Sequence, residues 1–327
     1  MNDNDTQPLV MFSPAGVVGQ PASVRRAARR LAKLGFEVGI DEAALARHQR
    51  FAGDDETRLA ALHRVAREGA RGERSVALAT RGGYGLTRLL DRIDWKLMAK
   101  SVDAGLRWVG YSDMTALQLA ALAHDAGGCE GGHDHKHHHH EHELEGGWWA
   151  GPMACGDFGV EDSQGGVDDV TQDCFVEAMH GKLEAIGFRT EAGFDGLGVK
   201  GRLWGGNLCV VMSLMGTPHF PRMKGGILFV EDVNEHPYRV ERDLLQLHQA
   251  GVLDAQKAVV LGSFTDFVKS PLDRGYSLKA AVAHVRTVTR TPILTGLPFG
   301  HVRTKVCLPV GRRVTLAVQG RDAFIGW

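Results

Sequence analysis

Two stretches in the first half of the chain decide the fold: residues 75–85 read SVALATRGGYG, and residues 106–115 read LRWVGYSDMT. Each begins with a short apolar run, passes through glycine and leads into a segment with helical spacing. A strand, a glycine turn and a helix in succession form one unit of a strand–helix alternation. Repetition of this unit predicts a parallel sheet with helices on both faces, and the carboxyl ends of its strands are where active sites gather.

The sequence on either side of these stretches continues the alternation. In the first half, the apolar spacing predicts further strands over 9–13 and 36–40 and helices over 21–34, 55–68, 86–90 and 114–124. In the second half it predicts strands over 226–230, 257–263, 305–309, 313–318 and 323–327, and helices over 174–181, 237–250 and 278–288. We therefore predict an α/β fold with an N-terminal domain over 1–165 and a smaller, mixed α/β domain over 166–327.

The composition narrows the class of partner. The 327 residues carry 38 Lys and Arg against 39 Asp and Glu, so no overall field attracts nucleic acid or an anionic membrane, and a small or neutral partner is favoured. No apolar run approaches the roughly 20 residues that span a bilayer, and the polar N-terminus does not look like a signal peptide. The five cysteines are scattered without a CxxC pair, which predicts no disulfide framework and a cytoplasmic location.

Residues 127–147 break the alternation, because histidines and acidic residues replace almost all aliphatic side chains. The seven histidines are His133, His135, His137, His138, His139, His140 and His142. Such a segment cannot bury a core and is predicted to form a mobile surface loop. Its imidazoles can bind zinc, nickel or copper adventitiously, but a fixed metal site needs ligands held in one geometry. A tolerated insertion is the main interpretation, a functional metal site is the remaining alternative, and no cofactor is predicted.

Ser112 follows an apolar strand and a glycine and precedes a helix, which is the arrangement of a nucleophile elbow. A hydroxyl at a helix N-terminus lies close to backbone N–H groups that can stabilise an oxyanion. The elbow pattern has glycine two residues after the serine, where this chain has Met114, and a serine in this place also serves as a plain helix cap. Gly275-Tyr276-Ser277 repeats the three letters but follows a loop, so Ser277 is interpreted as a cap.

Three further groups are candidates for chemistry. The loop over 82–85 either holds an anion through its N–H groups or is a tight turn that needs positive φ. Glu231 and Asp232 close an apolar strand, where buried carboxylates need partners unless they cap the next helix. His301 ends another apolar stretch and is either a structural residue or a general base at neutral pH.

Five short segments occur in an order that is far more specific than any one of them. They are Arg81-Gly82-Gly83-Tyr84-Gly85, Gly110-Tyr111-Ser112-Asp113, Leu203-Trp204-Gly205-Gly206-Asn207-Leu208, Glu231-Asp232-Val233-Asn234-Glu235-His236-Pro237 and Phe299-Gly300-His301. This series resembles the LD-carboxypeptidase family, the muramoyltetrapeptide carboxypeptidases. The resemblance covers nearly the whole chain, from Phe12 to Gly311.

The resemblance implies a serine peptidase whose catalytic triad is Ser112, Glu231 and His301. It also implies an oxyanion hole made by the backbone N–H groups of Gly83 and Asp113. Because the serine lies in the first predicted domain and its two partners in the second, the site is expected at the domain interface. The implied reaction removes the terminal D-alanine of a murein tetrapeptide, after L-lysine or meso-diaminopimelate, in cell-wall recycling. A homodimer is implied as well.

The chain departs from the family pattern at the histidine-rich insertion and at Ala150, where many relatives are expected to have histidine. Two alternatives stay open. A microcin C immunity-type peptidase of the same fold would cleave an acyl-nucleotide toxin with the same triad and would need an aromatic wall for the base. Trp148 and Trp149 are weak candidates for that wall and are interpreted as loop anchors. A metal-binding protein that uses the histidine run is the second alternative, and it predicts that chelation removes activity.

Overall fold

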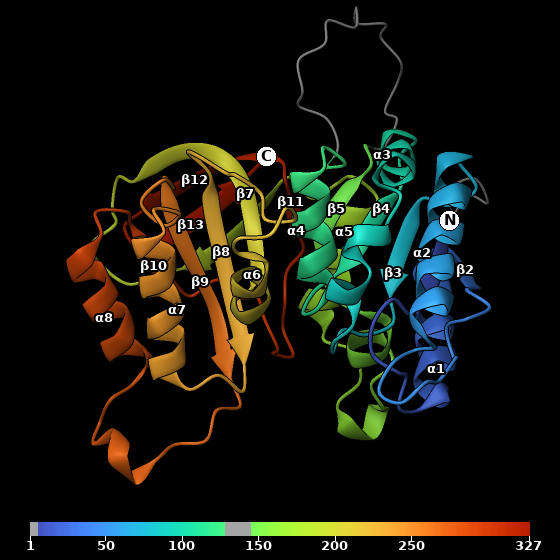
Figure 1. The fold of residues 1–327 in the computed structure, drawn as a ribbon, viewed down its shortest axis with the longest axis horizontal. Coiled ribbons are helices and arrows are strands. Elements are labelled where there is room, and N and C mark those ends of the chain that lie inside the picture. The colour runs from blue at the N-terminus through green and yellow to red at the C-terminus, as the bar shows by residue number, and fades with distance from the viewer. Residues whose placement is uncertain (1–5, 128–144) are drawn as a thin grey trace, which may run out of the picture.

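The computed structural model describes residues 6–127 and 145–327, which form two β-sheets with flanking helices (Figure 1). The α/β fold predicted from the sequence is confirmed. The histidines of the 133–142 run lie outside the described residues. The first sheet has the strand order β11-β5-β4-β3-β1-β2. Its strands are β1 (Gln7–Phe12), β2 (Phe36–Ile40), β3 (Val76–Ala79), β4 (Arg107–Gly110), β5 (Gly147–Ala150) and β11 (Leu308–Val310).

The strands of the first sheet run parallel except at one edge. Every residue of β3 and β4 is buried, as expected when both faces of a parallel sheet are covered. The edge strand β11 pairs antiparallel with β5 and comes from the far end of the sequence. Trp148 and Trp149, which the sequence placed in a loop, lie in β5 and are both buried.

The helices beside the first sheet form close to where the sequence predicts them, with three differences, one of which is that α5 begins at Asp169 and not at residue 174. The helices are α1 (Pro21–Lys33), α2 (Asp55–Ala70), α3 (Trp95–Asp103), α4 (Met114–Ala123) and α5 (Asp169–Met179). The sequence missed α3. The helix predicted over 86–90 is wrong, because the chain forms two 3₁₀ turns there, over Leu86–Arg88 and Leu90–Arg92. A short π-helical turn covers Ala154–Phe158, and a 3₁₀ turn covers Asp162–Gln164.

The second sheet is mixed, with the strand order β10-β9-β8-β7-β12-β13-β6. Its strands are β6 (Ala185–Arg189), β7 (Gly198–Asn207), β8 (Ile227–Val233), β9 (Ala258–Thr265), β10 (Ile293–Thr295), β12 (Arg313–Gln319) and β13 (Asp322–Gly326). Strands β7 to β10 are parallel, whereas β12, β13 and β6 pair antiparallel. Its helical segments are α6 (Leu208–Leu214), α7 (Pro237–Gln249), α8 (Leu278–Val288) and a 3₁₀ turn over Pro271–Asp273.

Two segments after residue 165 pack against the first half. Strand β11 completes the first sheet, and the ring of Phe175 in α5 lies 5.6 Å from that of Phe36 in β2. The segment between β10 and β11 runs through the space between the two sheets (Figure 1) and contacts β9 through the bond from Ser263 N–H to Phe299 O. The domain division at residue 165 stays a prediction, because the chain passes between the halves more than once.

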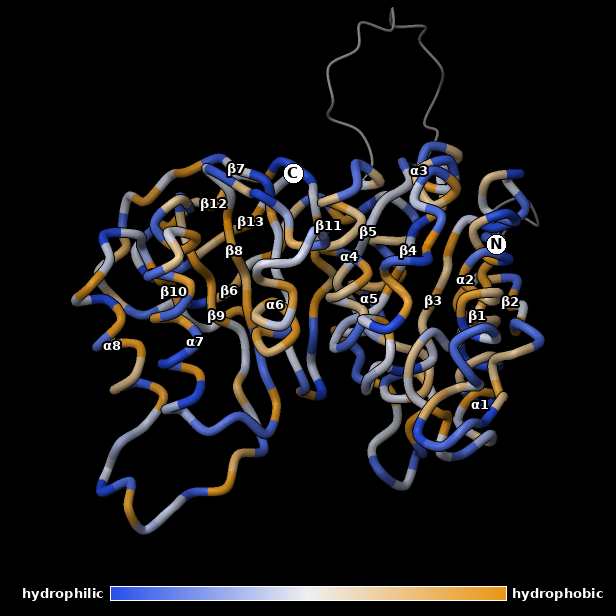
Figure 2. The backbone as a smooth tube through the Cα atoms, in the orientation of Figure 1, coloured by the Kyte–Doolittle hydropathy of each residue, from blue (hydrophilic) through white to orange (hydrophobic). Residues whose placement is uncertain are grey.

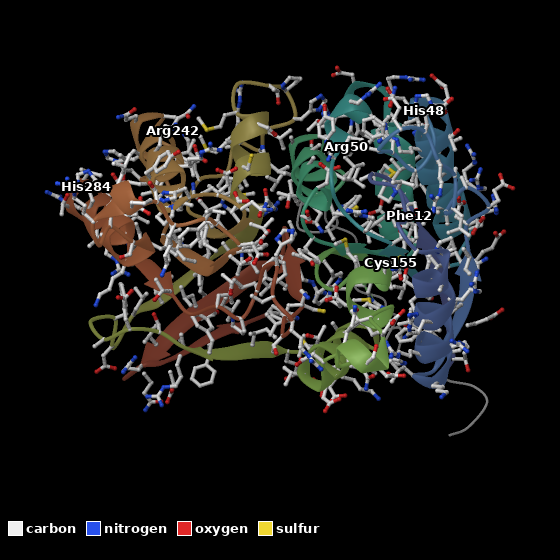
Figure 3. The ribbon with its side chains drawn as sticks, turned by 90° about the horizontal axis from the view of Figure 1, so that it is seen from below. Phe12, His48, Arg50, Cys155, Arg242 and His284 are labelled. Carbon is white, nitrogen blue, oxygen red and sulfur yellow. The ribbon has the colours of Figure 1, made fainter. Side chains whose placement is uncertain are left out.

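The hydrophobic residues gather on the strands and on the inner faces of the helices (Figure 2). Phe12 at the end of β1 is fully buried, whereas Arg242 and His284 lie on the outer surface of α7 and α8 (Figure 3). Among residues 6–127 and 145–327, no helix is both long enough and apolar enough to span a bilayer. The buried apolar residues of both sheets and of their helices form one continuous core, in which α4 is buried on almost every side.

Candidate active site

Ser112 lies in the turn between β4 and α4, with a backbone φ of +63°. This left-handed conformation costs a non-glycine residue about 1 kcal/mol, and it persists because the surrounding structure imposes it. The glycine-rich loop approaches closely: a Cβ on Gly82 would lie 2.8 Å from the Ser112 Oγ and 3.2 Å from the Asp113 N. Only glycine fits at this place, so the loop over 82–85 and the serine form one compact unit.

Hydrogen bonds fix the orientation of the glycine-rich loop. The N–H of Gly16 donates to the carbonyl of Gly82 at 3.0 Å. Because a trans peptide directs its C=O and N–H groups in opposite directions, the Gly83 N–H points away from Gly16. In the described parts of the chain, neither the Gly83 N–H nor the Asp113 N–H donates a hydrogen bond. Two free N–H groups beside a serine are what an oxyanion hole requires.

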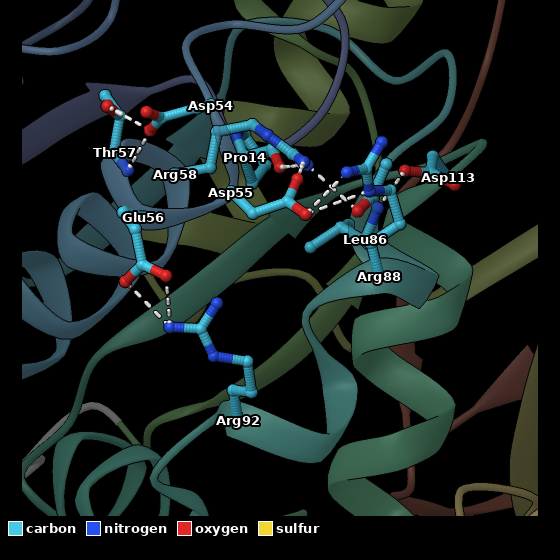
Figure 4. Close-up of polar contacts among 11 residues, drawn as sticks. Pro14, Asp54, Asp55, Glu56, Thr57, Arg58, Leu86, Arg88, Arg92 and Asp113 are labelled. Carbon is cyan, nitrogen blue, oxygen red and sulfur yellow. Dashed lines mark hydrogen bonds and ion pairs between the residues drawn. The ribbon is translucent and has the colours of Figure 1, made fainter.

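A buried arginine and Asp113 hold the other end of this loop (Figure 4). The Arg58 guanidinium donates to the carbonyl of Gly85 at 2.9 Å and to that of Pro14 at 3.2 Å. The Asp113 carboxylate accepts a hydrogen bond from the Leu86 N–H at 2.9 Å. Asp113 thus contacts the loop over 82–85 at both ends: its side chain binds the Leu86 N–H, and its backbone N–H lies beside Gly82.

Glu231 and His301 form a direct pair. Glu231 lies in β8 and is fully buried, and its Oε2 is 2.7 Å from the His301 Nδ1. Its other carboxylate oxygen accepts from the Asn207 Nδ2 at 3.2 Å. Gly300, with φ +136°, brings the backbone close, since a Cβ there would lie 3.1 Å from the Glu231 Oε2. An ionised carboxylate can only accept, so it directs the Nδ1–H inward and leaves Nε2 as a base.

Tyr111 joins this pair to the serine. Its ring meets the His301 ring edge to face at 4.9 Å, and it directly precedes Ser112. The Asn207 N–H also donates to the Thr115 Oγ1 of α4 at 3.0 Å, which ties the two halves together. Within the described residues, no hydrogen bond joins the Ser112 hydroxyl to His301. Such catalytic contacts often shorten only when substrate binds.

A cleft of about 410 Å³ opens beside His301. Residues from both halves line it: Tyr111, Gly156, Asp157, Val160, Gln164, Gly166, Asp168, His301, Val302, Arg303 and Lys305. At its base the Lys305 ammonium pairs with the Asp157 carboxylate, and both side chains are buried. The same ammonium lies 5.2 Å from the centre of the Tyr111 ring. The cleft is thus bounded by the imidazole on one side and by a buried ion pair on another.

Sequence reasoning named the five candidate site residues but missed several of their supports. Asn207 belongs to one of the family-like motifs, and no local pattern in the sequence marks Asp157 or Lys305. Ser277 caps α8 by accepting from the Ala280 N–H at 3.4 Å, so its interpretation as a cap is confirmed. Among the described residues, no group of three histidine, cysteine or acidic side chains could hold a metal ion.

Asp113 makes stability depend on pH. Burial raises the pKa of Asp113 to about 6, despite the hydrogen bond from Leu86. The pKa of an unfolded aspartate is about 3.9, so between pH 4 and 6 the folded chain keeps a proton that the unfolded chain has released. Stability contributed by this group therefore falls as the pH rises through that window.

We expect Asp113→Asn to raise the free energy of unfolding at pH 7 by about 2 kcal/mol. The asparagine side-chain oxygen can accept the same hydrogen bond from the Leu86 N–H, and burying asparagine removes no charge from water. Urea denaturation at pH 4.5 and pH 7 measures the effect, with Asp173→Asn, an exposed position on α5, as the control. A variant no more stable than the wild type at pH 7 would contradict the assignment.

Comparison with known proteins places the whole chain among peptidases. The profile of the LD-carboxypeptidase N-terminal domain matches residues 10–129, and that of the LD-carboxypeptidase C-terminal domain matches residues 200–316. A probable murein peptide carboxypeptidase of Bacillus subtilis is 28% identical over 325 residues, which is 99% of this chain and 92% of the relative.

Two solved structures show the same fold over nearly the full length. The muramoyltetrapeptide carboxypeptidase from Oxalobacter formigenes has a TM-score of 0.82 and is 36% identical, covering 98% of this chain and 99% of that one. MccF in complex with glutamyl sulfamoyl guanosine has a TM-score of 0.80 at 19% identity, covering 99% and 96%. The likeness to MccF extends to the fold alone.

Proposed function

The chain belongs to the LD-carboxypeptidase family and is a serine-type carboxypeptidase, and from this premise we propose that Ser112, Glu231 and His301 are its catalytic triad. We propose that it removes the terminal D-alanine of murein tetrapeptides. The observation that carries the proposal is the buried Glu231 bonded to His301 at 2.7 Å, with His301 against the residue that precedes Ser112. The full-length similarity to a muramoyltetrapeptide carboxypeptidase supports the substrate.

In the proposed mechanism, the His301 Nε2 takes the proton of Ser112 as the Oγ attacks the carbonyl of the scissile bond. Glu231 stabilises the imidazolium that forms. The negative oxygen of the tetrahedral intermediate binds the N–H groups of Gly83 and Asp113. His301 then gives its proton to the amine of D-alanine, which leaves. In the second half of the reaction, His301 takes a proton from a water molecule that attacks the acyl-enzyme, and it returns that proton to the Ser112 Oγ as the ester bond breaks.

We further propose that the enzyme works in the cytoplasm as a homodimer, as the family resemblance implies. Light scattering after size-exclusion chromatography tests the assembly. A mass near 71 kDa, twice that of the 35.5 kDa chain, supports the dimer, and a mass near that of one chain refutes it.

The nucleotide-cleaving alternative has less support. It needs an exposed aromatic face for a base, but Trp148 and Trp149 are only 1% and 5% exposed. Tyr111, the aromatic residue that lines the cleft, is buried between His301 and Lys305. The metal-dependent alternative rests on the histidine run and is tested by chelation, which we expect to leave turnover unchanged.

Mass spectrometry of two incubations tests the proposal: one with a murein tetrapeptide and one with an aminoacyl sulfamoyl nucleotide. We expect the tetrapeptide to lose one D-alanine and the nucleotide to stay intact. Cleavage of the nucleotide with an intact tetrapeptide would overturn the substrate assignment. Loss of turnover in EDTA with recovery in zinc would overturn the metal-free mechanism.

A further inference from the structure

Arg303 lies two residues after His301, on the same wall of the cleft. Its backbone is fixed, because its carbonyl accepts a hydrogen bond from the Thr171 hydroxyl at 3.1 Å, and the Thr171 Oγ1 in turn accepts one from the Lys305 N–H at 2.8 Å. Its guanidinium is exposed and donates to the carbonyl of Gly165. The backbone position of Arg303 in the wall of the cleft is therefore well defined, and the bond to Gly165 is the hydrogen bond that its guanidinium donates within the described residues.

The proposed reaction decides which part of the substrate enters this cleft. His301 must pass its proton to the amine of the leaving residue, so that residue lies on the imidazole side of the scissile bond. In a carboxypeptidase the leaving residue carries a free carboxylate. Moving a carboxylate out of water is costly unless a cation meets it, and a guanidinium fork matches its two oxygens.

The other charged groups of the cleft already have partners. Lys305 is buried against Asp157. The two Asp168 oxygens accept from the Thr171 N–H at 3.0 Å and from the Thr304 hydroxyl at 2.9 Å. Over residues 6–127 and 145–327, no carboxylate forms an ion pair with the Arg303 guanidinium, although the charge of Arg303 is among the groups that lower the pKa of the nearby Asp168. Arg303 is thus the cation of this cleft that is available to an incoming anion.

We propose that Arg303 binds the C-terminal carboxylate of the substrate and so makes the enzyme act on the last residue of a peptide. This inference rests on the proposed function. It explains why a cation follows the catalytic histidine on the leaving-group side, although no step of bond cleavage needs one. Arg303 would determine specificity, and its loss would raise KM for the acid more than it lowers kcat.

The test compares a tetrapeptide that ends in a free carboxylate with the same peptide ending in a carboxamide. We expect the wild type to prefer the acid in kcat/KM by about 10- to 100-fold, the range for a hydrogen bond to a charged group. For Arg303→Met, we expect kcat/KM for the acid to fall to near that for the amide, while the value for the amide stays within about 3-fold. Arg303→Lys should retain part of the preference.

Arg290→Met, at an exposed arginine after α8, is the matched control and should keep the full preference. An Arg303→Met enzyme that still prefers the acid as the wild type does would overturn the inference, and so would a wild type without preference. Failure of the wild type to cleave either peptide would refute the proposed function instead. Circular dichroism of each variant separates loss of the fold from loss of binding.

Discussion

Replacing Ser112 by alanine is expected to lower kcat/KM for the tetrapeptide by about 10⁴-fold or more, while the fold is retained. The change removes the oxygen that attacks the carbonyl, and neither the oxyanion N–H groups nor His301 can form the acyl-enzyme without it. Alanine at φ +63° bears nearly the same backbone strain as serine, so stability should change by less than about 1 kcal/mol. D-Alanine release, followed by mass spectrometry, measures the loss.

Ser277→Ala is the control for this experiment, because Gly275-Tyr276-Ser277 carries the same three letters as Gly110-Tyr111-Ser112. Ser277 caps α8, so its loss should cost about 1 kcal/mol of stability and no activity. Turnover by Ser112→Ala near that of the wild type would mean that Ser112 only begins α4. The proposed triad would then be wrong.

Replacing Lys305 by methionine is expected to destabilise the fold by about 3–5 kcal/mol, as when one partner of a buried ion pair is removed. Lys305 pairs with Asp157, and the Asp157 Oδ2 also accepts the Met153 N–H at 2.7 Å. Burial raises the pKa of Asp157 and the ammonium lowers it. Without Lys305 the carboxyl group must either stay charged in the core or take up a proton.

Chemical denaturation at pH 7 measures this effect. The double variant Lys305→Met with Asp157→Asn should recover most of the loss, because asparagine is neutral and still accepts the Met153 N–H. Arg71→Met breaks an exposed ion pair with Glu73 and should cost less than about 1 kcal/mol. A Lys305→Met protein within 1 kcal/mol of the wild type would show that the pair contributes little.

The sequence predicts most of the elements because local patterns carry them. The apolar runs over 226–230 and 257–263 became β8 and β9, and the helix over 278–288 was predicted with the bounds that α8 has. The strand–glycine–helix pattern marks Ser112 as a candidate, whereas the choice of Glu231 and His301 as its partners comes from the resemblance to the LD-carboxypeptidase family.

Features that depend on distant contacts could not be predicted. Strand β5 has only four residues, GWWA, and follows the histidine-rich segment in the sequence. It is a strand because it pairs with β4 and β11, which are distant contacts that its own residues do not reveal. The helix expected over 86–90 instead forms 3₁₀ turns, where the Asp113 carboxylate binds the Leu86 N–H. Asp157 and Lys305 lie far apart in the sequence, so no spacing rule links them.

The pairing of β11 with β5 has a consequence for how the protein is made. The chain emerges from the ribosome with its N-terminus first, so β1 to β5 are exposed long before Leu308–Val310 is made. During that interval the outer edge of β5 lacks its partner and exposes backbone groups that can pair with another chain. Nascent polypeptides stalled before residue 308 should therefore depend on chaperones, and the finished strand would end that dependence by covering the open edge of β5.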